Sequence, residues 1–125
     1  MRQALAGAGL APAQIDYINL HGTGTPSNDA AEDLAVQSVF GREVPCSSTK
    51  GATGHTLGAA GGVEAVISIL ALRHGLMPGG INVRERDPAL HSNYLQANRE
   101  QPVRHVLSNS FGFGGSNASL VLGGS

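Results

Sequence analysis

The sequence has little charge. Charged residues make up 14% of its 125 residues, and the formal net charge is −1, whereas soluble domains average about 25% charged residues. A chain with this balance has no basic face for nucleic acid and no polybasic segment for anionic lipid. We therefore expect no nucleic acid and no membrane as partners. So little charge also predicts that something else covers much of this surface.

Thiols are equally scarce. Cys46 is the one cysteine of the chain, which excludes an internal disulfide. The beginning of the chain lacks the basic and apolar regions of a signal peptide, and no apolar run approaches the roughly 20 residues that span a bilayer. These absences favour the reducing environment of the cytoplasm.

Metal-ligand spacing is missing as well, because the five histidines form no H-x-x-x-H pair and no pair with cysteine. Cys46 lies in the short apolar run 44–47, which predicts a strand where cysteine behaves as a small hydrophobe. A reactive thiolate requires a helix N-terminus or a nearby cation. We therefore expect no nucleophile in this chain. His74 and His91 are expected at the surface, and His105 in a strand.

Glycine, in contrast, is abundant, with 18 residues, and the length fits one domain. Sequence patterns predict strands at 15–20, 44–47, 103–109 and 118–122, and helices at 1–10, from Asn28 or Asp29 to Phe40, and at 58–74. The last helix is apolar on most faces, which predicts burial. Residues 76–101 are typical of a long irregular connection with a turn at Asp87–Pro88. The opening helix has no leading strand, which fits the interior of a longer protein as well as an ordinary N-terminal helix.

Two histidines stand in similar glycine- and threonine-rich loops. His21 begins the segment His-Gly-Thr-Gly-Thr, and His55 follows Lys50 by five residues. A neutral imidazole can donate an N–H to an oxygen that gains negative charge in a transition state. A nearby ammonium disfavours the charged imidazolium and so keeps this donor neutral. The pattern therefore predicts a site that contains both histidines. The alternative is that they are ordinary core or surface histidines without a chemical role.

A third loop alternates aromatic residues with glycines over residues 108–117. Glycine allows backbone conformations that are closed to other residues. The segment is either a structured gate or a tight β turn with Phe111 and Phe113 as core residues. A phosphate-binding loop is excluded, because the Gly-x-Gly-x-x-Gly pattern is absent and a strand follows instead of a helix.

Together, the three loops resemble the β-ketoacyl-acyl carrier protein synthases of the KAS I/II type. The matching motifs are His-Gly-Thr-Gly-Thr-Pro at 21–26, Ser-Thr-Lys with Gly-His-Thr-Leu-Gly-Ala-Ala-Gly over 48–61, and Asn-Ser-Phe-Gly-Phe-Gly-Gly at 109–115. They occur in the order and at the spacing of that family. The resemblance implies an α/β fold, the C-terminal half of a thiolase-like fold, with a mixed sheet and helices on both faces. Residues 1–125 would then form one C-terminal domain without its N-terminal half.

The resemblance also implies an activity, the decarboxylative Claisen condensation of an acyl thioester with malonyl-acyl carrier protein in fatty acid or polyketide biosynthesis. His21 and His55 would bind the malonyl thioester oxygen, and Lys50 would support His55. Substrate and the phosphopantetheine arm, which arrives on the carrier protein, would contact Thr23, Thr25, Phe111 and Phe113, with Phe113 as a gate. A structural monovalent or divalent cation would lie at Asn19, Glu64, Ser108 and Asn109. Asp29 and Glu32 would serve loop and helix-start structure.

One departure from the family concerns the nucleophile, since its cysteine belongs to the missing half and Cys46 does not replace it. The expected partners are acyl carrier protein, the missing N-terminal half, and a second synthase chain in a homodimer or heterodimer. The chain would be inactive alone and would expose apolar surface. Two alternatives stay open: a non-elongating malonyl decarboxylase, and a partner subunit similar to a chain length factor. The retained His21, Lys50 and His55 argue against the second.

Overall fold

A computed structural model describes residues 1–81 and 83–124, with the side chain of Phe113 outside the described part. Its centre is a five-stranded sheet with the strand order β4-β2-β1-β6-β7. The strands are β1 (Tyr17–Asn19), β2 (Pro45–Ser47), β4 (Asn93–Tyr94), β6 (His105–Phe111) and β7 (Asn117–Gly123). The first four are parallel to one another, and β7 pairs antiparallel with β6. The sheet is therefore mixed, as predicted.

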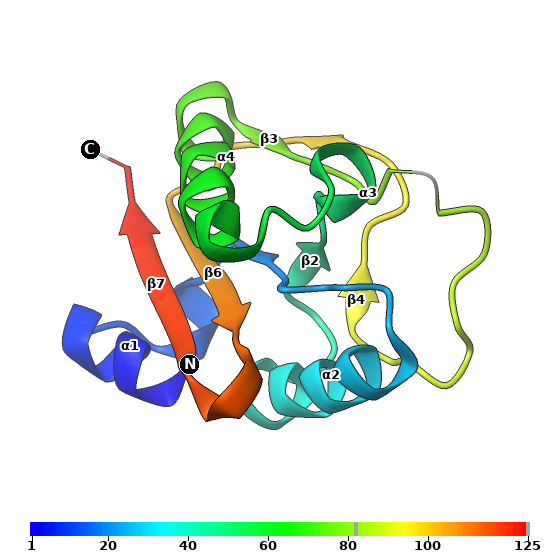
Figure 1. The fold of residues 1–125 in the computed structure, drawn as a ribbon. Coiled ribbons are helices and arrows are strands. Elements are labelled where there is room, and N and C mark those ends of the chain that lie inside the picture. The colour runs from blue at the N-terminus through cyan, green and yellow to red at the C-terminus, as the bar shows by residue number, and fades with distance from the viewer. Residues whose placement is uncertain (82, 125) are drawn as a thin grey trace.

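Helices cover both faces of this sheet (Figure 1). Side chains alternate along a strand, so Ile18 packs on one face with residues of α1 (Arg2–Ala8) and α2 (Pro26–Phe40). Tyr17 packs on the other face, in a cluster that Leu72 of α4 (Ala60–His74) joins. The prediction of helices on both faces is confirmed.

Helix α2 begins earlier than the sequence predicted. Thr25 has the extended backbone of an N-cap residue, and Pro26 is the first helical residue. Proline suits this position because its missing N–H would find no partner in the first turn. The predicted start at Asn28 or Asp29 was therefore wrong, whereas Gly41 ends the helix as expected, with φ +70°.

The connection 76–101 is less irregular than predicted. β3 (Leu76–Met77) and β5 (Arg99–Glu100) form an antiparallel ribbon, and β4 adds a parallel edge strand beside β2. Strands of two residues are too short to show a period in sequence. The expected turn is present, since the N–H of Leu90 donates to the carbonyl of Asp87 at 3.0 Å. A short helix, α3 (Lys50–Thr53), was also missed in the loop 48–55.

The C-terminal hairpin is the longest regular pairing. All seven residues of β6 pair with β7, from His105 opposite Gly123 to Phe111 opposite Asn117. A short 3-10 turn, η3 (Phe113–Gly115), joins the two strands. The two strands predicted at 103–109 and 118–122 are thus confirmed, and they pair as an antiparallel hairpin.

Helix α4 buries only one face within this chain. Ala60, Glu64, Ser68 and Ala71 lie against the sheet, whereas Val66, Ile69 and Leu70 are 45–56% exposed. By length and composition alone, Leu57–His74 is apolar enough to cross a membrane, with 22% of it buried, although no such run was expected. The predicted burial of this helix within the chain was therefore wrong, and the expected apolar surface of the isolated chain is confirmed.

Candidate active site

The three loops predicted to carry chemistry meet at one edge of the sheet. β2, β1 and β6 are adjacent and parallel, so their carboxyl ends lie side by side. β1 leads into His21, β2 leads into Lys50 and α3, and β6 ends at Phe111. Ligands of open α/β sheets bind outside the carboxyl ends of parallel strands. The order of the strands thus brings three motifs that are far apart in the sequence to one site.

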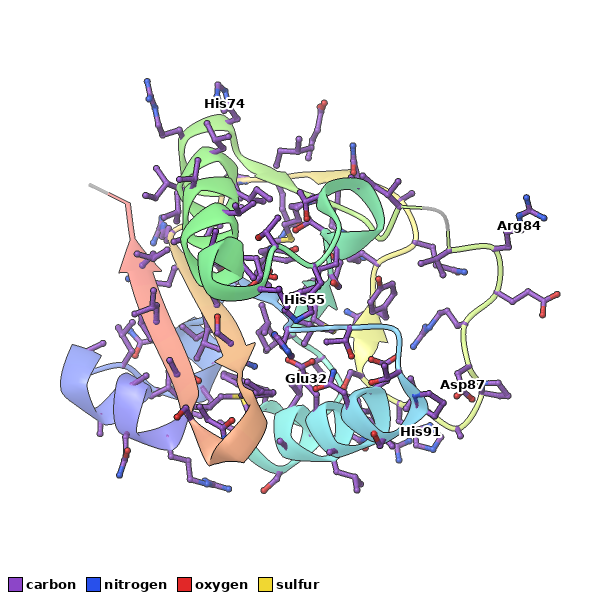
Figure 2. All side chains as sticks on the ribbon, in the orientation of Figure 1. Glu32, His55, His74, Arg84, Asp87 and His91 are labelled. Atoms are coloured by element: carbon purple, nitrogen blue, oxygen red, sulfur yellow. The ribbon has the colours of Figure 1, made fainter. Side chains whose placement is uncertain are left out.

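His21 and His55 approach each other closely. Their ring centroids are 5.4 Å apart, and the ring planes are nearly perpendicular, at 88°. The side chain of His21 is buried, whereas that of His55 is exposed. Figure 2 shows His55 on the loop before α4, above Glu32 of α2. The structure therefore brings together the two histidines that the sequence singled out.

His21 is a neutral imidazole at physiological pH. Burial, together with smaller contributions from the nearby Lys50 and His55, lowers its pKa to about 4. The ammonium nitrogen of Lys50 lies 3.5 Å from Nδ1 of His21. Because an ammonium can only donate, it faces the lone pair of Nδ1, and the ring proton belongs on Nε2. His21 can thus donate an N–H to an oxygen.

His55 has the same tautomer by a different route. The backbone N–H of Leu57 donates to Nδ1 of His55 at 3.1 Å. In a neutral ring this bond leaves the proton on Nε2. Two rings that each carry a proton on Nε2 therefore lie next to each other on separate loops, and two N–H donors of this kind can stabilise a developing oxyanion.

Lys50 makes different contacts from those expected. Its ammonium donates to the backbone carbonyl of His21 and to a carboxylate oxygen of Glu64. Within the described part of the chain it has no hydrogen bond to His55, so the expected support of His55 is replaced by support of His21. The physical reason is burial, since a buried ammonium needs a carboxylate partner, and α4 places Glu64 beside it.

Glu32 holds the backbone of the His21 loop. One carboxylate oxygen accepts from the N–H of His21 at 2.8 Å and the other accepts from the N–H of Gly22 at 2.9 Å. The side chain is 3% exposed, and burial raises its pKa. The sequence placed Glu32 in loop and helix-start structure, but it gave no sign of a link to His21, because the link depends on how α2 packs under β1.

The remaining substrate-binding candidates lie around the histidines. The ring of Phe111 is half-buried, and its centroid is 5.8 Å from that of His21. The hydroxyls of Thr23 and Thr25 share a hydrogen bond of 2.8 Å, and Thr25 is exposed. The side chain of Phe113 lies outside the described residues. A cavity of about 460 Å³ opens beside the site, and its lining includes Thr23, Lys50, His55, Ile81 and Tyr94.

The four cation candidates do not share one face of the sheet. Asn19 pairs with Ser108, and both face the side that α4 covers with Glu64. Asn109 points to the opposite side, where its amide nitrogen lies 3.4 Å from Glu32. The side-chain amide of Asn19 and one oxygen of Glu64 have no hydrogen-bond partner among the described residues. Such oxygens suit a hard cation, whereas the side chain of Asn109 does not join them.

Cys46 is a core residue, as expected. It lies fully buried in β2, and burial raises the pKa of its thiol to about 12. A thiol of this kind is almost entirely protonated at pH 7. His74 and His91 are exposed, and His105 belongs to β6, also as expected. No group of three metal-ligating His, Cys, Asp or Glu side chains occurs over residues 1–81 and 83–124.

Comparisons with known proteins agree with this geometry. The family described as "Beta-ketoacyl synthase, C-terminal domain" matches residues 1–84. The mitochondrial 3-oxoacyl-[acyl-carrier-protein] synthase of Arabidopsis thaliana is 50% identical, with 98% of this chain and 28% of that protein aligned. For 3-oxoacyl-[acyl-carrier-protein] synthase 2 of Coxiella burnetii the identity is 46%, over 98% of this chain and 30% of that protein.

Solved structures give the same result. The ketosynthase ApeO of Xenorhabdus doucetiae, in complex with its chain length factor ApeC, is 48% identical, with a TM-score of 0.94 over 100% of this chain and 32% of that one. A beta-ketoacyl synthase from Burkholderia phymatum is 38% identical, with a TM-score of 0.96 over 100% of this chain and 31% of that one. The chain thus spans less than a third of these relatives. It belongs to the beta-ketoacyl synthase family and has the fold of the C-terminal part of its thiolase-like architecture.

Proposed function

We propose that this chain is the C-terminal portion of a 3-oxoacyl-[acyl carrier protein] synthase and supplies the oxyanion site for decarboxylative condensation. The observation that carries the proposal is the pair of Nε2–H donors on His21 and His55, whose rings are 5.4 Å apart. Neither ring needs to gain or lose a proton to perform this role. The substrates would be malonyl-acyl carrier protein and an acyl thioester of fatty acid or polyketide synthesis.

The chemistry follows from where charge develops. When the malonyl group loses carbon dioxide, the electron pair of the broken bond moves toward the thioester carbonyl, whose oxygen becomes an enolate. The two N–H donors stabilise this oxygen as its charge grows. The enolate carbon then attacks the acyl thioester, a carbon–carbon bond forms, and the thiolate leaves. Thr23, Thr25, Phe111 and Phe113 would contact the phosphopantetheine arm and the substrate.

The thiol that carries the acyl group must come from elsewhere, since Cys46 is buried and protonated. We propose that a cysteine-bearing N-terminal half provides it and covers the exposed face of α4. We also propose a homodimer or heterodimer with a second synthase chain, a cytoplasmic location, and a structural cation held by Asn19, Glu64 and Ser108. The unpartnered amide of Asn19 and oxygen of Glu64 support the cation.

The test uses an assembled synthase, which we define as residues 1–125 joined to the N-terminal portion of the Arabidopsis relative. We expect His21→Ala and His55→Ala each to slow malonyl decarboxylation by about 100- to 1000-fold, the usual effect of losing one oxyanion donor. Transfer of the acyl group to the cysteine should stay largely intact. His74→Ala, at the exposed end of α4, is the control and should change neither step. Equal loss of both steps in His55→Ala would show that this histidine is structural.

A second candidate is a non-elongating malonyl decarboxylase, because the donor pair is present without a nucleophile. A third, a partner subunit similar to a chain length factor, is favoured by the ketosynthase complexes among the structural relatives. Decarboxylation of malonyl-acyl carrier protein by this chain without any cysteine-bearing half would support the second candidate. A His21→Ala, His55→Ala double variant that still restores full condensation to a separate synthase would support the third.

A further inference from the structure

We propose that Asp33 is a positioning residue that fastens the loop 84–92 to α2 and thereby shapes a cavity for the uncharged part of the substrate arm. We call residues 84–92 the outer loop. The inference rests on the proposed function, since that function brings a thioester on a phosphopantetheine arm to His21 and His55. It adds a wall for this arm and the residue that holds the wall, both outside the histidine pair.

The outer loop forms one wall of the cavity beside His55. It descends from the side of α3 to α2 (Figure 1). Its residues Arg86 and Leu90 line the cavity of about 460 Å³ together with Thr23 and His55. Cavities of about 300–1,000 Å³ are typical of small-molecule sites. A substrate arm that contacts Thr23 and reaches His55 would therefore meet the outer loop on its other side.

The charges around the cavity favour an uncharged occupant. Five carboxylates line it, those of Asp29, Glu32, Asp33, Glu85 and Asp87. Of the lysine and the arginine in the lining, Lys50 is paired with Glu64, and Arg86 donates to a backbone carbonyl. Like charges repel at close range, so an anion is disfavoured here. The arm between its phosphate and its thioester carries amide and methylene groups but no charge, and therefore suits this cavity.

Asp33 fastens the outer loop at its C-terminal end. Its buried carboxylate accepts the backbone N–H of Ser92 at 2.8 Å and that of His91 at 3.1 Å. Figure 2 shows His91 beside α2. The guanidinium of Arg86 donates to the carbonyl of Ser92 at 2.6 Å, so Ser92 is held at both its N–H and its C=O. Gln37, one turn further along α2, donates to Asp33 at 2.6 Å and keeps the carboxylate in place.

Asp33 is ionised in this environment. Burial alone would raise its pKa, but the hydrogen bonds from Ser92, His91 and Gln37 outweigh burial and lower the pKa below its usual value. Hydrogen bonds to an ionised group are about twice as strong as those between neutral groups. The outer loop is thus tied to a helix by strong bonds, and loss of this one side chain should free it.

A matched control lies at the other end of the sheet. Asp16 also accepts two consecutive backbone N–H groups, from Arg104 at 2.7 Å and from His105 at 3.1 Å. It lies at the amino ends of β1 and β6, whereas the cavity adjoins the loops at the carboxyl ends of β1 and β2. Loss of either carboxylate removes similar hydrogen bonds, but only the loss of Asp33 frees the outer loop.

The experiment compares Asp33→Ala with Asp16→Ala in the assembled synthase. In Asp33→Ala we expect KM for malonyl-acyl carrier protein to rise about tenfold, as for one lost hydrogen bond to a charged group. The kcat of decarboxylation should change less than about twofold, because the loop would bind substrate and transition state alike. Hydrogen–deuterium exchange at residues 91–92 should become about tenfold faster. Asp16→Ala should alter neither KM nor this exchange.

A conservative variant and a second substrate sharpen the result. Asp33→Asn keeps one oxygen for the same two N–H groups, so its KM should lie between those of the native enzyme and Asp33→Ala. Malonyl-pantetheine lacks both the phosphate and the carrier protein, and its KM should rise as much in Asp33→Ala. A rise that occurs only with the carrier protein would place the outer loop against that protein and overturn the inference.

Two further results would count against Asp33. One is an unchanged KM in Asp33→Ala although exchange at residues 91–92 rises, and the other is an equal fall of kcat in Asp33→Ala and Asp16→Ala. If Asp33→Ala does not fold, Leu90→Ala tests the wall directly. It should raise KM at least about threefold through lost apolar contact, and an unchanged KM would be equally decisive. Failure of the proposed function would be distinct, since His21→Ala alone would then leave decarboxylation unchanged.

Discussion

The ring of His21 has two close neighbours: the ammonium of Lys50 lies 3.5 Å from its Nδ1, and the centroid of the His55 ring lies 5.4 Å from its own. Each of these neighbours disfavours a positive charge on His21, and burial disfavours it more. The result is a histidine that stays neutral at a pH where a free imidazole would be partly charged. At the residue scale, this environment turns an ordinary side chain into a permanent N–H donor.

This shift predicts a pH dependence of stability. Below about pH 6.5 the unfolded chain gains a proton at this histidine, whereas the folded chain gains it only near pH 4. The free energy of unfolding therefore falls as pH falls through this window. We expect the midpoint temperature of the assembled synthase to drop less between pH 7 and pH 5 in His21→Asn than in the native protein.

The native protein must be compared with His21→Asn because other groups near His21 also titrate. Burial raises the pKa values of Glu32 and Glu64, so these carboxyls contribute stability that is lost as pH rises, which is the opposite sign. They are present in both proteins and cancel in the difference. An equal or steeper drop in His21→Asn would contradict the lowered pKa of His21.

A second residue-scale prediction concerns Gly22. We expect Gly22→Ala to lower the midpoint temperature more than Gly24→Ala. Both glycines have positive φ, at +44° and +77°, but an added Cβ meets Ser48 only at Gly22 and meets nothing within 4 Å at Gly24. Strain alone costs about 1–2 kcal/mol, and overpacking adds about 1–3 kcal/mol. Equal effects, measured by differential scanning fluorimetry, would mean that Ser48 moves aside without cost.

At the scale of elements, the buried ion pair of Lys50 and Glu64 joins α3 to α4. Removal of one partner from such a pair costs about 3–5 kcal/mol, because the other charge is left buried and alone. We expect Lys50→Met or Glu64→Leu to lower the midpoint temperature strongly, and the double variant to recover much of that loss. A double variant as unstable as the sum of the single ones would show that the two side chains act independently.

The elements also show what the sequence could and could not predict. Longer patterns, such as α4 and the strands β6 and β7, were predicted because periodicity over five or more residues is informative. β3, β4 and β5 were missed because each has two residues. The start of α2 was misplaced because Asn28 and Asp29 are good caps in isolation, although Pro26 fits the first helical position.

The site residues also divide into features that local sequence predicts and features that depend on packing between distant elements. The chemical types and the loops of His21, His55 and Lys50 were readable from local motifs. The contact of Lys50 with His21 could not be predicted in this way. It depends on Glu64, fourteen residues further along the chain, which the packing of α4 brings to the ammonium. The same holds for Glu32, whose partners come from the end of another element.

At the scale of the whole molecule, two histidine rings lie side by side, whereas the one thiol of the chain is buried. We expect the isolated chain to form no new carbon–carbon bond between acyl and malonyl thioesters, since its one thiol is buried with a raised pKa. The measurement is product formation with labelled malonyl thioester. Condensation by the purified chain, abolished by Cys46→Ala, would show that this thiol becomes accessible and reactive.

Glu32 and Asp33 are consecutive residues of α2 that hold two different loops. Neighbours in an α-helix point about 100° apart around its axis, so one rigid rod sets the angle between the two loops. Removal of a single residue from α2 ahead of Glu32 would rotate both carboxylates by that amount and misalign both attachments at once. The number of residues between the start of this helix at Pro26 and Glu32 must therefore stay constant.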